Sequence, residues 1–171
     1  MVDPWPILRY RSVGWMSDPP ANVFPNLIVA DGSRLTSEFV AKYNITHVIN
    51  CARDEMSPAW FRALHPQKYV AIGAEDSPLA NIMLWYPRFE EYVNKFLAES
   101  DGNIFVHCQL GINRSPILAC IYESKKLKKN FMGVTDRVIR QRPCAFTNFT
   151  YLKQANDYIK SLLNSNEQLG R

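Results

Sequence analysis

The sequence predicts a single α/β domain, in which a central sheet of four to five mostly parallel strands is flanked by helices. Short apolar runs rich in β-branched residues alternate along the chain with longer segments whose apolar residues recur every three or four positions. The 171 residues, 47% of them hydrophobic and 21% charged, match the size and balance of one globular domain. This alternation is typical of strands that are buried between layers of helices.

Four apolar runs predict buried strands, because each is short and is bounded by polar or turn-forming residues. They are NLIVA at 26–30, THVIN at 46–50, YVAIG at 69–73 and NIFVH at 103–107. Amphipathic periods predict helices over 34–43, 115–127 and 131–141, from about Trp85 to Leu97, and from Phe149 to Leu162.

Composition divides the chain into an N-terminal arm at 1–22, a folded domain large enough to be catalytic at 23–164 and a frayed tail at 165–171. The arm contains four prolines together with Trp5 and Trp15, and two roles stay open for these aromatics: packing on the domain, which we expect, or a dimer contact. The run KKLKK at 125–129 is interpreted as a solvated helix end, with docking of an acidic partner or nucleic acid as the alternative.

Charge and cysteine usage exclude several classes of protein. The net charge of +4 suits an anionic substrate but falls short of a dedicated nucleic-acid binder. The four cysteines form no CxxC pair and no metal-type cluster with the three histidines, which argues against a zinc site or a disulfide framework. No stretch approaches about 20 uninterrupted apolar residues, so we expect a cytoplasmic or nuclear protein without a membrane span.

The stretch VHCQLGINRS at 106–115 carries the clearest chemical signal. NIFVH ends at Cys108, and a helix with Pro116 in its first turn is expected after Arg114, so the 108–114 loop joins a strand to a helix. Gly111 permits a positive φ, which lets successive amide N–H groups line one concavity at the positive end of the helix dipole. We expect this loop, formed with Gln109, Leu110, Ile112 and Asn113, to bind a tetrahedral oxyanion.

The same electric field stabilises a thiolate, so we expect Cys108 to be ionised at neutral pH. Arg114 supplies a planar set of donors that binds two phosphate oxygens, and Ser115 is placed to donate its hydroxyl to the sulfur. We expect His107 to hold the loop by hydrogen bonds. A route through a phosphoenzyme also needs a proton donor, and Asp76, in the stretch AIGAEDSPLANI, is our candidate in preference to its neighbour Glu75.

The pattern His107-Cys108-x-x-Gly111-x-x-Arg114-Ser115 resembles the signature of the cysteine-dependent protein tyrosine phosphatases, in their compact, atypical dual-specificity branch. The resemblance extends from about Val23 to Ile159. It includes FPNLIVAD, ITHVINCA, the spacing of Asp76 before the cysteine, and RQRPCAFTNFTYLKQ. It implies hydrolysis of phosphate monoesters through phosphocysteine without metal or cofactor, with Cys108 as nucleophile, Arg114 as phosphate clamp and Asp76 as general acid.

Departures from the family pattern narrow the range of substrates that we expect. No Trp-Pro precedes Asp76, which implies a shallow pocket that accepts phosphotyrosine, phosphoserine and phosphothreonine in proteins. Gln109 and Ile112 stand where inositide phosphatases of this superfamily usually carry lysines. Asn113 is shared with RNA 5′-triphosphatases, which keeps an RNA 5′ end as the alternative substrate, although Leu110 and Ser115-Pro116 depart from the residues typical of those enzymes.

Other interpretations of these residues stay open. A cysteine-to-arginine loop also occurs in sulfurtransferases and arsenate reductases, but neither accounts for the acid loop at Asp76. A phospho-binding module without turnover is the alternative from another class. Cys51 ends the strand HVINC, on the side of the sheet where the 108–114 loop is expected; it is interpreted as a buried strand residue, or as a redox partner that forms a disulfide with Cys108.

Overall fold

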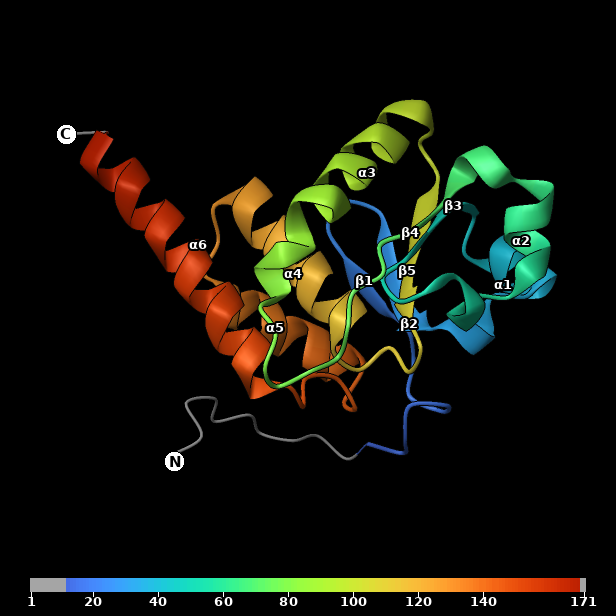
Figure 1. The fold of residues 1–171 in the computed structure, drawn as a ribbon, viewed down its shortest axis with the longest axis horizontal. Helices are drawn as coiled ribbons and strands as arrows, with labels where there is room; N and C mark the ends of the chain where they lie inside the picture. Colours follow the sequence, from blue (N-terminus) through green and yellow to red (C-terminus); the bar gives the residue numbers. More distant parts are fainter. Residues whose placement is uncertain (1–11, 170–171) are drawn as a thin grey trace.

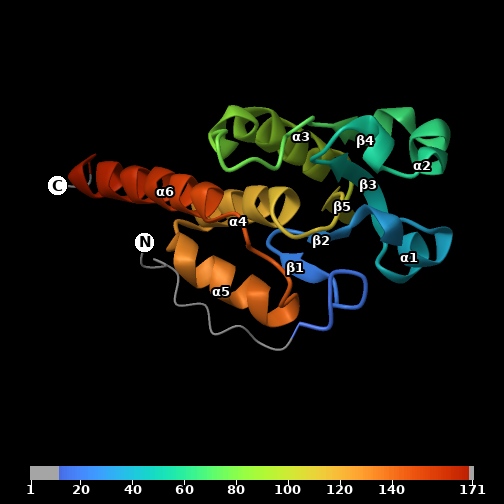
Figure 2. The same ribbon diagram turned by 60° about the horizontal axis from the view of Figure 1, so that its bottom comes forward.

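The computed structural model describes residues 12–169, the last three by their backbone alone. Five strands form one sheet, and helices cover both of its faces (Figures 1 and 2). The helices are α1 (Ser37–Lys42), α2 (Ala59–Leu64), α3 (Tyr86–Glu99), α4 (Arg114–Leu127), α5 (Phe131–Gln141) and α6 (Phe149–Leu169). Short 3₁₀ turns occupy Gly32–Arg34, Asp54–Met56, Pro66–Lys68 and Ile82–Leu84.

The strand order across the sheet is β1-β2-β5-β3-β4. At one edge β1 (Ala21–Val23) runs antiparallel to β2 (Leu27–Asp31), and every other pairing is parallel. β5 (Asn103–Cys108) lies in the centre, between β2 and β3 (Ile45–Asn50), and β4 (Tyr69–Ala71) closes the far edge. The carboxyl ends of β2 and β3 therefore lie on either side of the end of β5.

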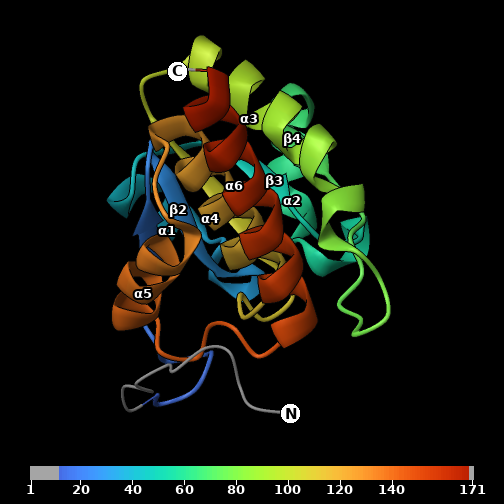
Figure 3. The same cartoon turned by 90° about the vertical axis from the view of Figure 1, so that its left-hand side faces the viewer.

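Alternating side chains of the strands divide the core between the two faces of the sheet. Leu27 and Val29 of β2 pack with α3 to α6, whereas Ile28 and Ala30 pack with the cluster under α1 and α2. Figure 2 shows α1 and α2 across the sheet from the other four helices. α4 lies against β5, and α6 crosses in front of α4 in Figure 3. α4 is thereby packed between β5 and α6, and it starts at Arg114, six residues after the end of β5.

The structure confirms the predicted fold class and the four predicted strands, and it adds two elements. β1 and α2 are short, at three and six residues, and neither shows the periodicity that would reveal it. β1 begins inside the range expected for the arm, and α6 continues to Leu169, through residues expected to fray. Trp5 lies outside the described residues. No helix between residues 12 and 169 is long and apolar enough to cross a bilayer.

Candidate active site

The 108–114 loop begins where the central strand ends. Cys108 is the last residue of β5 and pairs in register with Asp31 of β2, while the neighbouring His107 pairs with Asn50 of β3. α4 starts at Arg114, so the loop joins the carboxyl end of a central parallel strand to a helix N-terminus. This is the position at which α/β sheets bind ligands and at which the helix dipole favours an anion.

The Cys108 thiol is enclosed by its neighbours. The residue is 2% exposed, and its Sγ lies 3.3 Å from Oγ of Ser115, which occupies the first turn of α4. The hydroxyl is thus within reach of the sulfur, as expected from the sequence. A thiolate at this point would face the positive end of α4 and accept a hydrogen bond from Ser115.

Gly111 makes the path of the loop sterically feasible. Its φ is +66°, and a Cβ atom built on it would lie 2.4 Å from the carbonyl carbon of Ala30 and 2.6 Å from the amide nitrogen of Asp31. The loop therefore packs directly on the backbone at the end of β2. Both the left-handed backbone and the close approach require a residue without a side chain.

The Arg114 guanidinium has one nitrogen that is hydrogen-bonded and another that is buried without a partner among the described residues. Its Nη1 donates to the carbonyl oxygen of Ala74 at 3.0 Å, which links the start of α4 to the segment that carries Asp76. Its Nε is buried, and within residues 12–169 it has no hydrogen-bond partner. A buried donor of a cation is costly to leave unpaired, and an anion bound in the loop would satisfy it.

His107 supports the loop from the core. It is fully buried, and Nδ1 lies 2.9 Å from the carbonyl oxygen of Cys108 while Nε2 lies 2.9 Å from Oγ of Ser57. A carbonyl only accepts, so Nδ1 carries the proton and Ser57 donates to Nε2. Burial lowers the pKa of His107 to about 4, against the opposing effects of the Cys108 carbonyl and Asp31. The ring is neutral at physiological pH, and its two hydrogen bonds hold the carbonyl group of Cys108 in place.

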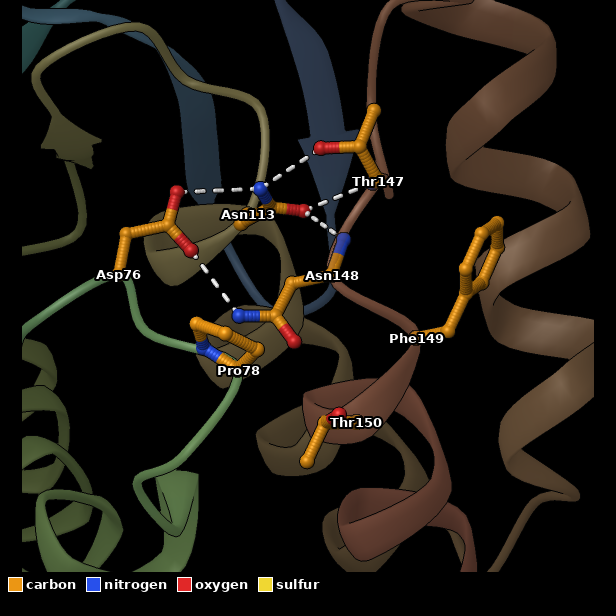
Figure 4. A pocket seen from close by; sticks show the side chains of 7 residues that line it. All are labelled: Asp76, Pro78, Asn113, Thr147, Asn148, Phe149 and Thr150. Atoms are coloured by element: carbon orange, nitrogen blue, oxygen red, sulfur yellow. Dashed lines mark hydrogen bonds between the residues drawn. The ribbon is translucent and has the colours of Figure 1, made fainter.

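Asp76 is held beside the loop by two side-chain amides. Nδ2 of Asn113 donates to Oδ2 of Asp76 at 3.1 Å, and Nδ2 of Asn148 donates to Oδ1 at 3.0 Å (Figure 4). Asn113 also accepts the backbone N–H groups of Thr147 and Asn148, each at 2.8 Å. The loop, the Asp76 segment and the start of α6 are therefore joined through one buried asparagine.

The neighbouring Glu75 is exposed, and its backbone carbonyl accepts a hydrogen bond of 2.6 Å from the hydroxyl of Tyr151. Of the two candidate acids, Asp76 is thus the one whose carboxylate is tied to the 108–114 loop. An open pocket of about 410 Å³ adjoins it (Figure 4), lined by Asp76, Pro78, Asn113, Thr147, Asn148, Phe149 and Thr150. A substrate group attached to a phosphate in the loop has room there.

Cys51 lies next to the loop, as its position in the sequence suggested. Its amide donates to the carbonyl oxygen of His107 at 2.6 Å, and the residue is fully buried. Burial raises the pKa of the Cys51 thiol, and the proximity of Cys108 raises it further, while Arg114 lowers it. Cys51 is thus protonated at neutral pH.

The remaining residues of the 108–114 loop differ in how far they are exposed to solvent. Gln109 is exposed, Leu110 and Ile112 are half-buried, and Asn113 is buried. Sequence reasoning did not assign roles to Ser57, Asn148, Tyr151 or Arg142, which contact His107, the loop or the Asp76 segment. The only signal for Asn148 was its place before an aromatic residue at the start of the last helix, where its Oδ1 accepts the N–H of Tyr151 at 3.1 Å.

Comparisons with known proteins agree with this architecture. The family model described as the dual specificity phosphatase catalytic domain matches residues 27–161. A probable dual specificity protein phosphatase of Dictyostelium discoideum is 28% identical over 138 residues, covering 81% of this chain and 34% of the relative. Human dual specificity protein phosphatase 16 is 27% identical over 160 residues, 93% of this chain and 23% of the relative. The chain thus spans about a third or less of the length of these two relatives.

Solved structures show the same fold. A mouse putative dual specificity phosphatase complexed with zinc tungstate superposes with a TM-score of 0.73 at 19% identity, covering 93% of this chain and 96% of that one. Human DUSP28 superposes with a TM-score of 0.69 at 18% identity, covering 84% and 95%. The chain belongs to the dual specificity phosphatase family, which confirms the family expected from the sequence.

Proposed function

We propose that this chain hydrolyses phosphate monoesters of tyrosine, serine and threonine in proteins through a phosphocysteine intermediate. The observation that carries the proposal is the arrangement around Cys108. An enclosed thiol at a helix N-terminus lies 3.3 Å from a hydroxyl, the same loop carries a guanidinium with a buried unpaired donor, and a carboxylate is tied to that loop by a side-chain amide. The family and fold support protein phosphatase activity.

In the first step the Cys108 thiolate attacks phosphorus, and the bond from phosphorus to the ester oxygen breaks. Asp76, protonated at this stage, gives its proton to the departing oxygen, so that an alcohol or a phenol leaves. Arg114 and the amides of the 108–114 loop hold the three other oxygens as charge develops on them. The hydrogen bonds from Asn113 and Asn148 keep the Asp76 carboxyl group beside the leaving group.

In the second step water attacks the phosphorus of phosphocysteine, and Asp76, now a carboxylate, accepts a proton from the water. The sulfur–phosphorus bond breaks, and the electron pair returns to Sγ of Cys108. Ser115 stabilises the departing thiolate by donating its hydroxyl hydrogen. Inorganic phosphate leaves, and the two protonation states of the first step are restored.

The open pocket beside Asp76 supports a phosphorylated protein as substrate, because its lining contains one acid and no basic residue, which suits a peptide better than a polyanion. An RNA 5′ end remains the alternative substrate. Cytoplasmic or nuclear location, and a dimer contact through the arm, stay predictions from the sequence.

The test is hydrolysis of an aryl phosphate and of phosphotyrosine and phosphothreonine peptides in EDTA, by the wild type and by Cys108→Ser. We expect turnover by the wild type and none by the variant. Cys120→Ser is the matched control, because Cys120 is an equally buried cysteine within α4. Activity that survives Cys108→Ser would overturn the mechanism. Faster turnover of 5′-triphosphorylated RNA than of any phosphopeptide would favour the RNA alternative, and phosphopeptide binding without phosphate release would favour a binding module.

A further inference from the structure

Arg142, which follows α5, lies fully buried behind the 108–114 loop. Its Nη2 donates to the carbonyl oxygen of Leu110 at 2.9 Å, and its Nε donates to the carbonyl oxygen of Gly111 at 2.9 Å. The other acceptors around the guanidinium are the carbonyl oxygens of Trp15, Asp18 and Pro19 and the carboxylate of Asp31. A fully buried guanidinium is tolerated only because its N–H donors have hydrogen-bond acceptors.

These two contacts determine the direction of two amide groups in the loop. In a planar trans peptide the C=O and the N–H point in opposite directions. Holding the carbonyls of Leu110 and Gly111 toward Arg142 therefore turns the N–H groups of Gly111 and Ile112 away from Arg142, to the opposite side of the loop. Polarisation of each carbonyl by the guanidinium also strengthens the N–H of the same peptide as a donor.

Two other groups hold the loop in the same way. The backbone N–H of Phe146 donates to the carbonyl oxygen of Ile112 at 2.7 Å, and Nδ1 of His107 donates to that of Cys108 at 2.9 Å. Four peptide groups of the loop are thus held from behind. Arg142 accounts for two of these four contacts, and it is the one charged side chain among the three residues that make them.

We infer that Arg142 is a positioning residue for oxyanion binding: it orients the Gly111 and Ile112 amides into the loop's anion site and joins that site to residues 15–19. The inference rests on the proposed function, in that it assumes that the loop binds the phosphoryl group. It assigns a role in the reaction to a residue that does not touch the substrate.

Arg34 provides a matched control, because it shares three acceptors with Arg142. Its Nε donates to Asp31 at 3.0 Å, and its Nη2 donates to the carbonyl oxygens of Trp15, at 3.4 Å, and of Asp18. Its hydrogen bonds go to the arm and to Asp31, not to the loop carbonyls. Loss of either arginine weakens the arm and the pairing of Asp31, but only loss of Arg142 releases the loop.

The experiment compares Arg142→Lys, Arg142→Met and Arg34→Met. Tungstate affinity is measured by calorimetry in the Cys108→Ser background, and kcat/KM is measured with aryl and alkyl phosphates in the active background. We expect Arg142→Met to lower both the tungstate affinity and kcat/KM by about 100-fold. Arg142→Lys keeps the charge but not the planar arrangement of N–H donors, and should lower them by about 10-fold. The loss should be equal for the two ester types, because the loop amides contact the phosphoryl group of every substrate. Arg34→Met should lower stability but not tungstate affinity.

Folded Arg142 variants that bind tungstate like the wild type would overturn the inference, and so would an equal loss of tungstate affinity in Arg34→Met. If neither Arg142 variant folds, nuclear magnetic resonance of the wild type decides. We then expect slow solvent exchange of the Arg142 Nε–H and joint shifts of the Gly111 and Ile112 amides on addition of tungstate; fast exchange or unresponsive amides would overturn it. A wild type that binds tungstate without hydrolysing any ester contradicts the proposed function alone.

Discussion

Replacing Gly111 with alanine tests whether the close packing of the 108–114 loop on β2 is needed for anion binding. The new Cβ would lie 2.4 Å from the carbonyl carbon of Ala30, 2.6 Å from its oxygen and 2.6 Å from the amide nitrogen of Asp31. All three atoms belong to the backbone of Ala30 and Asp31, which pair with His107 and Cys108 in the sheet, so the loop must move rather than the sheet.

Gly73 separates the two costs of this substitution. Its φ is +76°, close to the +66° of Gly111, but a Cβ built on Gly73 would meet no atom within 4 Å. Gly73→Ala therefore measures backbone strain alone, about 1–2 kcal/mol. Gly111→Ala adds the collision, for which overpacking costs of about 1–3 kcal/mol are typical.

Urea denaturation and tungstate calorimetry measure the two effects. We expect Gly73→Ala to lower the free energy of unfolding by about 1–2 kcal/mol and Gly111→Ala to lower it by about 2–5 kcal/mol. Gly111→Ala should also weaken tungstate binding by about 100-fold, because a displacement of the loop amides of about 1 Å has that effect. The reasoning fails if Gly111→Ala is no less stable than Gly73→Ala, or if it binds tungstate as the wild type does.

Three further outcomes are expected. The pKa of His107 is about 4 in the folded protein and about 6.5 in the unfolded chain, so between these pH values the unfolded chain binds one more proton than the folded protein. The contribution of neutral His107 to the free energy of unfolding is therefore complete above about pH 6.5 and falls by at most about 3 kcal/mol toward pH 4. Urea denaturation of His107→Gln should show a flatter pH dependence, and an unchanged slope would contradict this assignment. Asn148→Ala should lower kcat/KM about 10-fold for phosphothreonine peptides and less for p-nitrophenyl phosphate, whose leaving group departs without a proton; equal losses would argue against a role beside Asp76. Mild peroxide should convert Cys108 to a sulfenic acid that condenses with the Cys51 thiol to a disulfide and water, and Cys51→Ser should instead accumulate sulfinic acid; mass spectrometry that finds sulfinic acid equally in both proteins would exclude the disulfide.

The strand-to-helix loop could be predicted because the residues that define it are close together in the sequence. A branched apolar run, a cysteine, a glycine that tolerates positive φ and a proline in the first helical turn all lie within 103–116. The same holds for the strands and the longer helices, whose periodicity reports burial on one face. The short elements β1 and α2 were missed because three and six residues hold too little pattern.

The parallel α/β class and the group of residues in the 108–114 loop can be predicted from the sequence alone, since both follow from side-chain types at short spacing. Tertiary structure supplied the contacts that tie Asp76, the acid preferred from the sequence, to that loop, because its partners are Asn113 and Asn148, the latter 72 residues away along the chain. It likewise placed Arg142 behind the loop. Hydrogen bonds between backbone carbonyls and a distant arginine depend on how the chain is packed, and no pattern along the sequence records them.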